Sequence, residues 1–487
     1  MKTTALNQAG YYALGIILMK GVSLLMIPYV TRQLSPTEYG TLETLLVLAD
    51  ISTIIIGFGL VEALNRFVGL ANKENANRLI ANCFGLSIFI AVLSMLLIMG
   101  FASTLLTHLP ADITLQQVFL IACPVILEGL IAIPLTLMRM QSLAKRFCFL
   151  NVIKAIVQAL LVVVLLELGY GIDAILIAGA LASVLLVFFL MPYQWQQMAG
   201  QWHWRESIKI LRYGTPIVAG RLGLFAMTGL DRWLLADKVG IESLAVYAIA
   251  VKFALILGLL MQPFTLWWFP YRFVLLKQEN GKQECANFAM FGTHLGLVLG
   301  FMMMVTLPSF MQLILPSAYH DAAFIVVALL VVNMIKNAGD LLNLGCFVGS
   351  SISQMWVQWI CAVVAVFGYV YLIEDYGVWA AAGVLAFVYA LRLMLFFAYS
   401  QRVLPLPYQY QPLITVIILG IVMLVTMQTG LGFFSGLEDS LVVILTFMLG
   451  CVLSLLYLCS LIALDVLPNP LSWWQARNAS KAKKVMV

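Results

Sequence analysis

Charged residues are scarce in this sequence, and they form no long polar segment. Only 10% of the 487 residues are Asp, Glu, Lys or Arg, whereas 63% are hydrophobic. Soluble globular domains contain about 25% charged residues. A helix that crosses the roughly 30 Å hydrocarbon core of a membrane needs about 20 mostly apolar residues. Such apolar runs recur along the whole sequence, which excludes an ordinary soluble domain and predicts an all-α integral membrane protein.

Several motifs typical of enzymes and metal proteins are also missing. The eight cysteines stand singly, and neither a CxxC pair nor a His/Cys cluster with metal-ligand spacing occurs. We therefore expect no metal site and no other cofactor. No Walker A sequence occurs, so we expect no ATP hydrolysis by this chain. The net charge of +5 follows from membrane topology and gives no reason to expect a nucleic-acid partner.

The spacing of the apolar runs predicts about 14 transmembrane helices. We expect them at residues 10–31, 40–63, 79–101, 116–138, 149–168, 172–192, 211–235, 242–265, 286–307, 322–343, 355–373, 377–400, 412–430 and 440–463. With the N-terminus in the cytoplasm, most of the 27 Lys and Arg residues, Lys154 and Arg272 among them, lie on the cytoplasmic side. The positive-inside rule then predicts a multi-pass protein of the inner-membrane type with both termini in the cytoplasm.

The second part of the sequence repeats the layout of the first. The stretches 10–49 and 212–251 each contain an apolar helix with one cation (Lys20; Arg221), a charged turn and a second apolar helix. A shift of about 206 residues aligns six helices with the next six and places Tyr170-Gly171 on Tyr376-Gly377. Because six is even, the two copies have the same orientation, which predicts two six-helix lobes related by a parallel pseudo-twofold repeat. Transporters built this way bind their substrate between the lobes.

This repeat predicts three parts of the chain. We expect an N-lobe over residues 1–205, a C-lobe over residues 206–405, and two appended helices with a basic cytoplasmic tail over residues 406–487.

Five cations lie well inside apolar helices, where a charge must face a cavity or a partner. They are Lys20, Arg221, Lys252, Lys336 and Arg392. We expect the first three to be buried and to line a cavity for an anionic, phosphate-bearing substrate. Structural roles stay open: Asp50 or Glu128 would neutralise one of these three. Lys336 would pair with Asp340 four residues away, and Arg392 would reach the lipid headgroups.

Two motifs resemble those of the Wzx-type polysaccharide flippase family. Gly15, Lys20-Gly21, Pro28 and the run from Thr31 to Gly40 resemble the signature of its first helix. The run from Asp231 to Leu235, followed by Val246-Tyr247, resembles its motif at the turn between helices seven and eight. The family belongs to the multidrug/oligosaccharidyl-lipid/polysaccharide (MOP) exporter superfamily, so the resemblance implies a fold like those of MATE and MurJ.

The resemblance implies transport in the bacterial inner membrane and no enzymatic activity. The cargo would be an undecaprenyl-pyrophosphate-linked oligosaccharide for cell-surface polysaccharide such as lipopolysaccharide or exopolysaccharide. It would move from the cytoplasmic to the periplasmic leaflet by alternating access. The partners would be this cargo, membrane lipids, and the polymerase and chain-length proteins of the same pathway. Because one chain contains both lobes, we expect a monomer.

The resemblance also implies roles for particular residues. The five intramembrane cations Lys20, Arg221, Lys252, Lys336 and Arg392 would bind the pyrophosphate. Asp231 and Arg232 would gate the outer rim. Apart from the resemblance, Asp50 and Glu128 lie within predicted apolar helices and are candidates for coupling transport to an ion.

Three other functions stay open. A peptidoglycan-precursor flippase of the same superfamily has the same number of helices and a cationic cavity. A cation-coupled multidrug antiporter shares the fold but needs an acidic cavity, which the excess of cations disfavours. A membrane polymerase, ligase or glycosyltransferase usually needs a large outer loop, and every predicted outer loop here is short.

Overall fold

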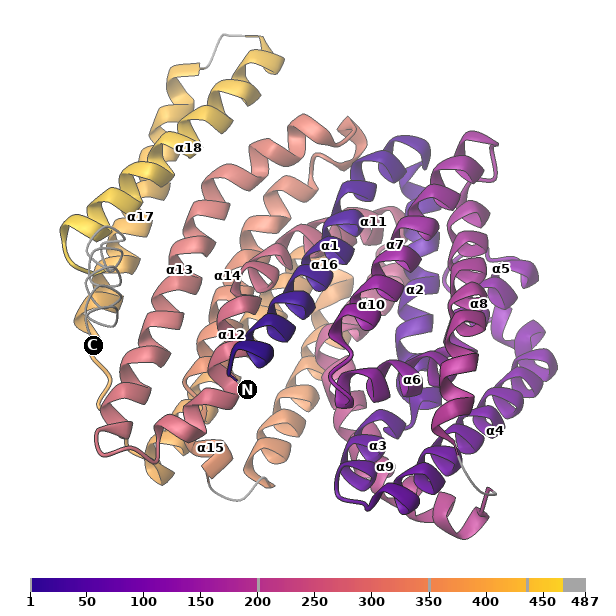
Figure 1. Ribbon diagram of the computed structural model, residues 1–487. Helices are drawn as coiled ribbons and strands as arrows, with labels where there is room; N and C mark the ends of the chain where they lie inside the picture. The colour runs from indigo at the N-terminus through magenta and orange to yellow at the C-terminus, as the bar shows by residue number, and fades with distance from the viewer. Residues whose placement is uncertain (1, 199–201, 349–351, 435–437, 467–487) are drawn as a thin grey trace. The chain divides into compact units, whose positions relative to one another are not determined.

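The computed structural model describes residues 2–198, 202–348, 352–434 and 438–466, and every regular element in these ranges is a helix (Figure 1). The α-helices are α1 (Lys2–Gln33), α2 (Pro36–Gly57), α3 (Leu60–Gly69), α4 (Lys73–Leu106), α5 (Leu115–Ile126), α6 (Glu128–Met140), α7 (Ala144–Glu167), α8 (Ile172–Gln197), α9 (Trp204–Thr228), α10 (Leu230–Lys238), α11 (Ile241–Ala254), α12 (Ile256–Leu275), α13 (Gly281–Ile314), α14 (Ala322–Leu341), α15 (Leu344–Val348), α16 (Ile352–Val403), α17 (Gln411–Leu431) and α18 (Asp439–Ala463). Two short 3-10 helices, η1 (Ser317–Tyr319) and η2 (Gly432–Phe434), complete the set. The all-helical fold class is confirmed.

Within the described residues, 11 helices are long and apolar enough to cross a membrane. One of them is α16, in which the backbone at Gly377 is not helical (φ 56°, ψ −133°), so that two helices follow one another there. Neither α1 nor the pair α9–α10 is among the 11. The difference between the expected 14 helices and these 11 comes from α1, from α9–α10 and from the two helices joined in α16. The number of 14 stays a prediction.

Local sequence explains where the second predicted span begins and bends. Ser35 caps α2: its hydroxyl accepts from the Glu38 amide at 3.2 Å, and the Glu38 carboxylate accepts from the Ser35 amide at 2.9 Å. This reciprocal capping box satisfies two amides that the first helical turn leaves free. Phe58 and Gly59 both adopt positive φ (40° and 66°), which ends α2 and lets α3 begin in a new direction.

Contacts along the chain define two compact units. Unit 1 contains Met1–Ile249 and Gln358–Leu385, and unit 2 contains Ala250–Val357 and Ala386–Val487. This grouping places the start of the predicted C-lobe in unit 1. The division into parts at residues 205/206 and 405/406 therefore stays a prediction.

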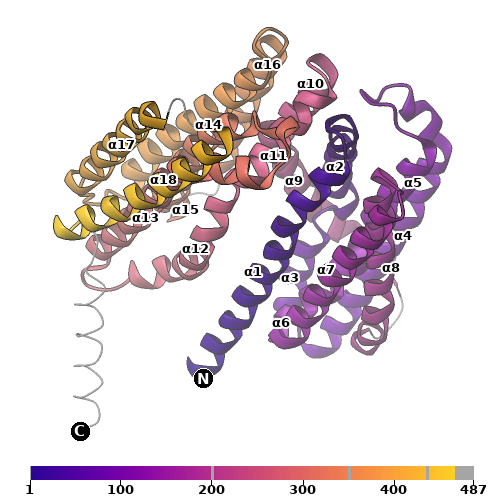
Figure 2. The ribbon, with the colours of Figure 1, turned by 90° about the horizontal axis from the view of Figure 1, so that it is seen from above.

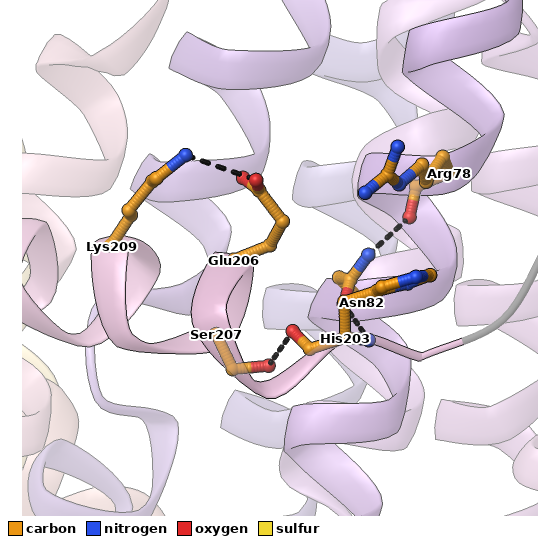
Figure 3. Close-up of polar contacts among 6 residues, drawn as sticks. All are labelled: Arg78, Asn82, His203, Glu206, Ser207 and Lys209. Carbon is orange, nitrogen blue, oxygen red and sulfur yellow. Dashed lines mark hydrogen bonds and ion pairs between the residues drawn. The ribbon is translucent and has the colours of Figure 1, made fainter.

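In unit 1, α9 packs against α2, α3 and α4. The segment before α9 is tied to α4, because the His203 amide donates to the Asn82 side chain at 2.7 Å (Figure 3). Asn82 in turn donates to the carbonyl of Arg78 at 2.9 Å. The start of the predicted second lobe is thus fixed to helices of the first.

In unit 1, one pair of aligned glycines and a similar glutamate contact shortly before each of them support the predicted repeat. Gly171 (φ 51°, ψ −130°) and Gly377 (φ 56°, ψ −133°) share a backbone conformation that is essentially restricted to glycine. Shortly before each glycine, a glutamate binds the end of an earlier helix. Glu167 accepts from the Tyr29 hydroxyl at 2.6 Å, and Glu374 pairs with Lys238 at 2.5 Å. This hydrogen bond is the main reason that the pKa of Lys238 is raised.

In unit 2, α13 occupies the central position and packs against α12, α14, α17 and α18. The helices α17 and α18 lie side by side next to α13 in both views (Figures 1 and 2). Trp268, Met290 and Leu341 belong to a buried cluster that joins α12, α13 and α14.

Candidate functional site

An ion pair links two helices of unit 1. Arg221 on α9 pairs with Glu62 on α3, and their side chains are 43% and 34% exposed. The two helices come close because Gly214 of α9 has no side chain: a Cβ there would lie 2.2 Å from the Phe58 carbonyl oxygen. The prediction that Arg221 is buried is wrong. Its partner is also neither Asp50 nor Glu128.

A second carboxylate lies near this pair. Glu128, on α6, is within electrostatic range of both Arg221 and Lys154 on α7. Because α7 begins at Ala144, Lys154 is about 15 Å along the helix axis from its start. Lys154 therefore lies near the middle of α7, which is one of the candidate membrane spans, and not in a loop on the cytoplasmic side. It belongs with the intramembrane cations of unit 1.

Lys20 lies at the level of Lys154 on the neighbouring helix. Gly15 packs on Cys148 at one end of the α1–α7 contact, and Tyr29 binds Glu167 at the other, so the two helices run parallel. Lys20 is exposed, and the prediction that it is buried is wrong. No ion-pair partner is seen for it among the described residues. A Lys at membrane depth must face water or an anion rather than lipid.

Unit 2 contains an ion pair of its own. Arg392 on α16 pairs with Asp340 on α14 at 2.9 Å, and their side chains are 15% and 32% exposed. The Arg392 guanidinium also lies 4.7 Å from the ring of Phe396. Both earlier interpretations are therefore wrong: Asp340 pairs with Arg392 rather than Lys336, and Arg392 does not extend to headgroups. The Lys336 amine lies over the ring of Tyr389, at 5.8 Å from its centroid.

Lys252, half-buried near the end of α11, belongs to unit 2, whereas Lys20 and Arg221 belong to unit 1. That the three line one cavity stays a prediction.

Arg272 is a buried cation. It is only 3% exposed, and its predicted place on the cytoplasmic side stays a prediction. Its guanidinium donates to the Asn343 side chain at 3.1 Å and lies 4.4 Å from the ring of Phe347. The signal in the sequence is the aromatic run WWFPYRF at residues 267–273, in which an Arg is surrounded by rings that cover its face.

Comparison with known proteins shows the family. A family model described as "Polysaccharide biosynthesis protein" matches residues 29–324. The chain belongs to this family.

Two proteins of Haemophilus influenzae are relatives of this polysaccharide biosynthesis protein. One comes from the Lsg locus and is 22% identical over 278 residues, which cover 55% of this chain and 66% of that protein. The other, described as an uncharacterized membrane protein, is 23% identical over 332 residues, covering 64% of this chain and 74% of its own length.

Solved structures show the fold of this polysaccharide biosynthesis protein. The lipid II flippase MurJ in an inward closed conformation superposes with a TM-score of 0.74 at 10% identity, covering 94% of this chain and 99% of that one. A MATE transporter in complex with MaD3S gives a TM-score of 0.58 at 14% identity, covering 82% and 95%. The expected MATE/MurJ-like fold is thus confirmed.

The Asp231–Arg232 motif of the polysaccharide biosynthesis protein is not in a turn. Both residues lie in the short helix α10, and Asp231 is only 2% exposed. Its carboxylate accepts from the hydroxyl of Tyr247 on α11 at 2.7 Å. Arg232 lies within electrostatic range of Asp231, Glu43 and Asp50. The motif therefore forms a buried charged cluster between α2, α10 and α11.

The ends of α2 and α11 meet beside this cluster. The Thr37 hydroxyl donates to Glu242 at 2.8 Å. A Cβ on Gly40 would lie 2.1 Å from the carbonyl oxygen of Ile241, so only glycine permits this approach. The contact joins two helices that the predicted repeat treats as equivalent.

Proposed function

We propose that this polysaccharide biosynthesis protein is a flippase for an undecaprenyl-pyrophosphate-linked oligosaccharide. It moves the cargo from the cytoplasmic to the periplasmic leaflet of the bacterial inner membrane by alternating access, and supplies cell-surface polysaccharide synthesis.

The observation that carries this proposal is the set of cations that lie well inside the helices. Lys20, Lys154 and Arg221 lie on helices of unit 1, and Lys336 and Arg392 lie on helices of unit 2. Charges at this depth are costly and are kept where they serve a substrate or a partner. A guanidinium binds phosphate oxygens through two parallel hydrogen bonds, and a Lys adds a point charge. The pyrophosphate of a lipid-linked sugar fits such groups, whereas a cationic drug does not.

The remaining roles follow from this cargo. Lys20, Arg221, Lys252, Lys336 and Arg392 bind the pyrophosphate, while the polyprenyl chain stays in lipid. Asp231 and Arg232 control opening towards the periplasm, and Asp50 and Glu128 are the candidates for ion coupling. Both termini are cytoplasmic. The protein acts as a monomer next to the polymerase and chain-length proteins of its pathway.

The test is depletion of the protein in cells, followed by lipid extraction and mass spectrometry. The proposal expects a polyprenyl-pyrophosphate oligosaccharide to accumulate in the cytoplasmic leaflet. Wild-type protein should restore its movement, and a variant with Lys20, Arg221 and Lys252 replaced by Ala should not. Lys209→Ala, which removes a 67% exposed amine paired with Glu206 on the surface of α9, is the control and should restore movement fully.

Other results would assign another function. Accumulation of a peptidoglycan precursor would favour a flippase of the MurJ type, like the solved structure that superposes with a TM-score of 0.74. Accumulation of the oligosaccharide lipid in the periplasmic leaflet would place the protein after flipping, as a polymerase or ligase. Unchanged lipids with altered sensitivity to cationic dyes would indicate a drug antiporter.

A further inference from the structure

We propose that Glu62 is an internal counter-anion that competes with the pyrophosphate of the cargo for Arg221. This inference rests on the proposed flippase function and deepens it, because it names a residue that sets the affinity for the cargo.

The geometry of the pair supports competition. Arg221 uses its Nη2 group to bind Glu62 Oε1. Carboxylate and phosphate oxygens occupy the same donor edge of a guanidinium, so one anion excludes the other there. With 43% of its side chain exposed, Arg221 is open to an incoming anion even while the pair exists.

Glu62 is held in place to serve this role. It lies in the first turn of α3, directly after the bend at Phe58 and Gly59, and its other oxygen, Oε2, is buried without a hydrogen-bond partner in the described structure. An unsatisfied buried carboxylate oxygen is costly. The carboxylate is therefore positioned against Arg221 although this position does not satisfy both its oxygens.

The local charges show what the carboxylate achieves. Glu62 pairs with Arg221, and Glu128 lies within electrostatic range of both Arg221 and Lys154. In an empty transporter Glu62 thus neutralises Arg221, which avoids the cost of an uncompensated guanidinium. When cargo has left, Glu62 takes its place on Arg221, which lowers the net affinity for the anion and favours its release.

Binding to the purified full-length protein in detergent tests this competition, with farnesyl pyrophosphate as the probe. Glu62→Gln keeps the shape of the side chain and removes its charge. We expect it to bind the probe about fivefold more tightly, because a partly exposed ion pair contributes roughly this factor. Glu62→Asp keeps the charge with a shorter reach and should give a smaller gain. Thermal unfolding of each variant checks that it is folded.

The controls isolate the pair. Glu206→Gln removes a carboxylate that pairs with Lys209 at 2.9 Å (Figure 3). This pair lies on the same helix as Arg221 but in its first turns, so the change should leave the affinity for the probe unchanged. In an Arg221→Gln background, Glu62→Gln should give no gain. Transport of cargo by Glu62→Gln should show a lower KM together with slower turnover, which a merely structural role would not produce.

The outcomes separate the two proposals. If the wild type moves the lipid-linked oligosaccharide and both Glu62 variants bind the probe no more tightly than the wild type, the counter-anion role is wrong and the flippase function stands. If Glu62→Gln binds more tightly but the wild type moves no such lipid, the competition exists and the proposed cargo is wrong.

Discussion

Removing the hydroxyl of Tyr247 tests whether Asp231 carries its charge in the folded protein. The hydroxyl donates to the Asp231 carboxylate at 2.7 Å, and the two residues are 0% and 2% exposed. Tyr247→Phe keeps the ring and deletes this bond, which leaves the carboxylate one donor short.

The same unit contains a matched reference. Tyr369 is also 0% exposed, and its hydroxyl donates to the carbonyl of Met227 at the same distance, 2.7 Å. A hydrogen bond to a neutral acceptor contributes about 1 kcal/mol, and one to a charged acceptor about 1.5–3 kcal/mol. We therefore expect Tyr247→Phe to lower the free energy of unfolding by about twice as much as Tyr369→Phe.

Unfolding by SDS in mixed detergent micelles, followed by tryptophan fluorescence, gives both free energies on one scale. Adding Asp231→Asn should remove the difference between the two Tyr→Phe changes, because the acceptor is then neutral. If Tyr247→Phe costs no more than Tyr369→Phe in the wild-type background, Asp231 is not an ionised acceptor. The reasoning about a buried charged cluster would then fail.

Two further predictions concern glycines. Gly40→Ala should lower the melting temperature and weaken the contact between α2 and α11, since its Cβ would lie 2.1 Å from the Ile241 carbonyl oxygen. The control is Gly100→Ala on α4, where nothing lies within 4 Å, and it should stabilise the helix by about 0.5–1 kcal/mol. Equal effects of the two changes would contradict the close approach of α2 and α11. Gly171→Ala and Gly377→Ala should each cost about 1–3 kcal/mol in the same SDS titration, because both positions have positive φ. If only one of the two is sensitive, the correspondence of these positions in the predicted repeat loses its support.

The helices were predictable because each depends on a local property of the sequence. The apolar run before Arg66 and the capping residues Ser35 and Glu38 mark a helix without any knowledge of its neighbours. The correspondence of Gly171 with Gly377 was also visible, since turns between long helices stand out in an apolar sequence. The two glycines share a backbone conformation, as expected if these positions correspond in the repeat.

The partners of the charges were not predictable. Glu62 and Arg221 are 159 residues apart, and nothing local distinguishes Glu62 from Asp50 or Glu128 as the partner. Counting charges by side of the membrane also did not show that Lys154 lies near the middle of α7 or that Arg272 is buried. The charge count depends only on how near a residue is to the end of an apolar run. The burial of the residue depends on where its helix begins and on which side chains pack over it.

The attachment of α9 to α4 has a consequence for how the protein is made. The Asn82–His203 bond and the packing of α9 on α2, α3 and α4 provide a docking surface that already exists when α9 leaves the ribosome. The later helices can therefore pack onto α2, α3 and α4, which are already in place, and need not begin from an isolated hairpin. A gene cut between codons 205 and 206 would deprive the second fragment of that template, so the two halves should need to be synthesised together to reach the folded state.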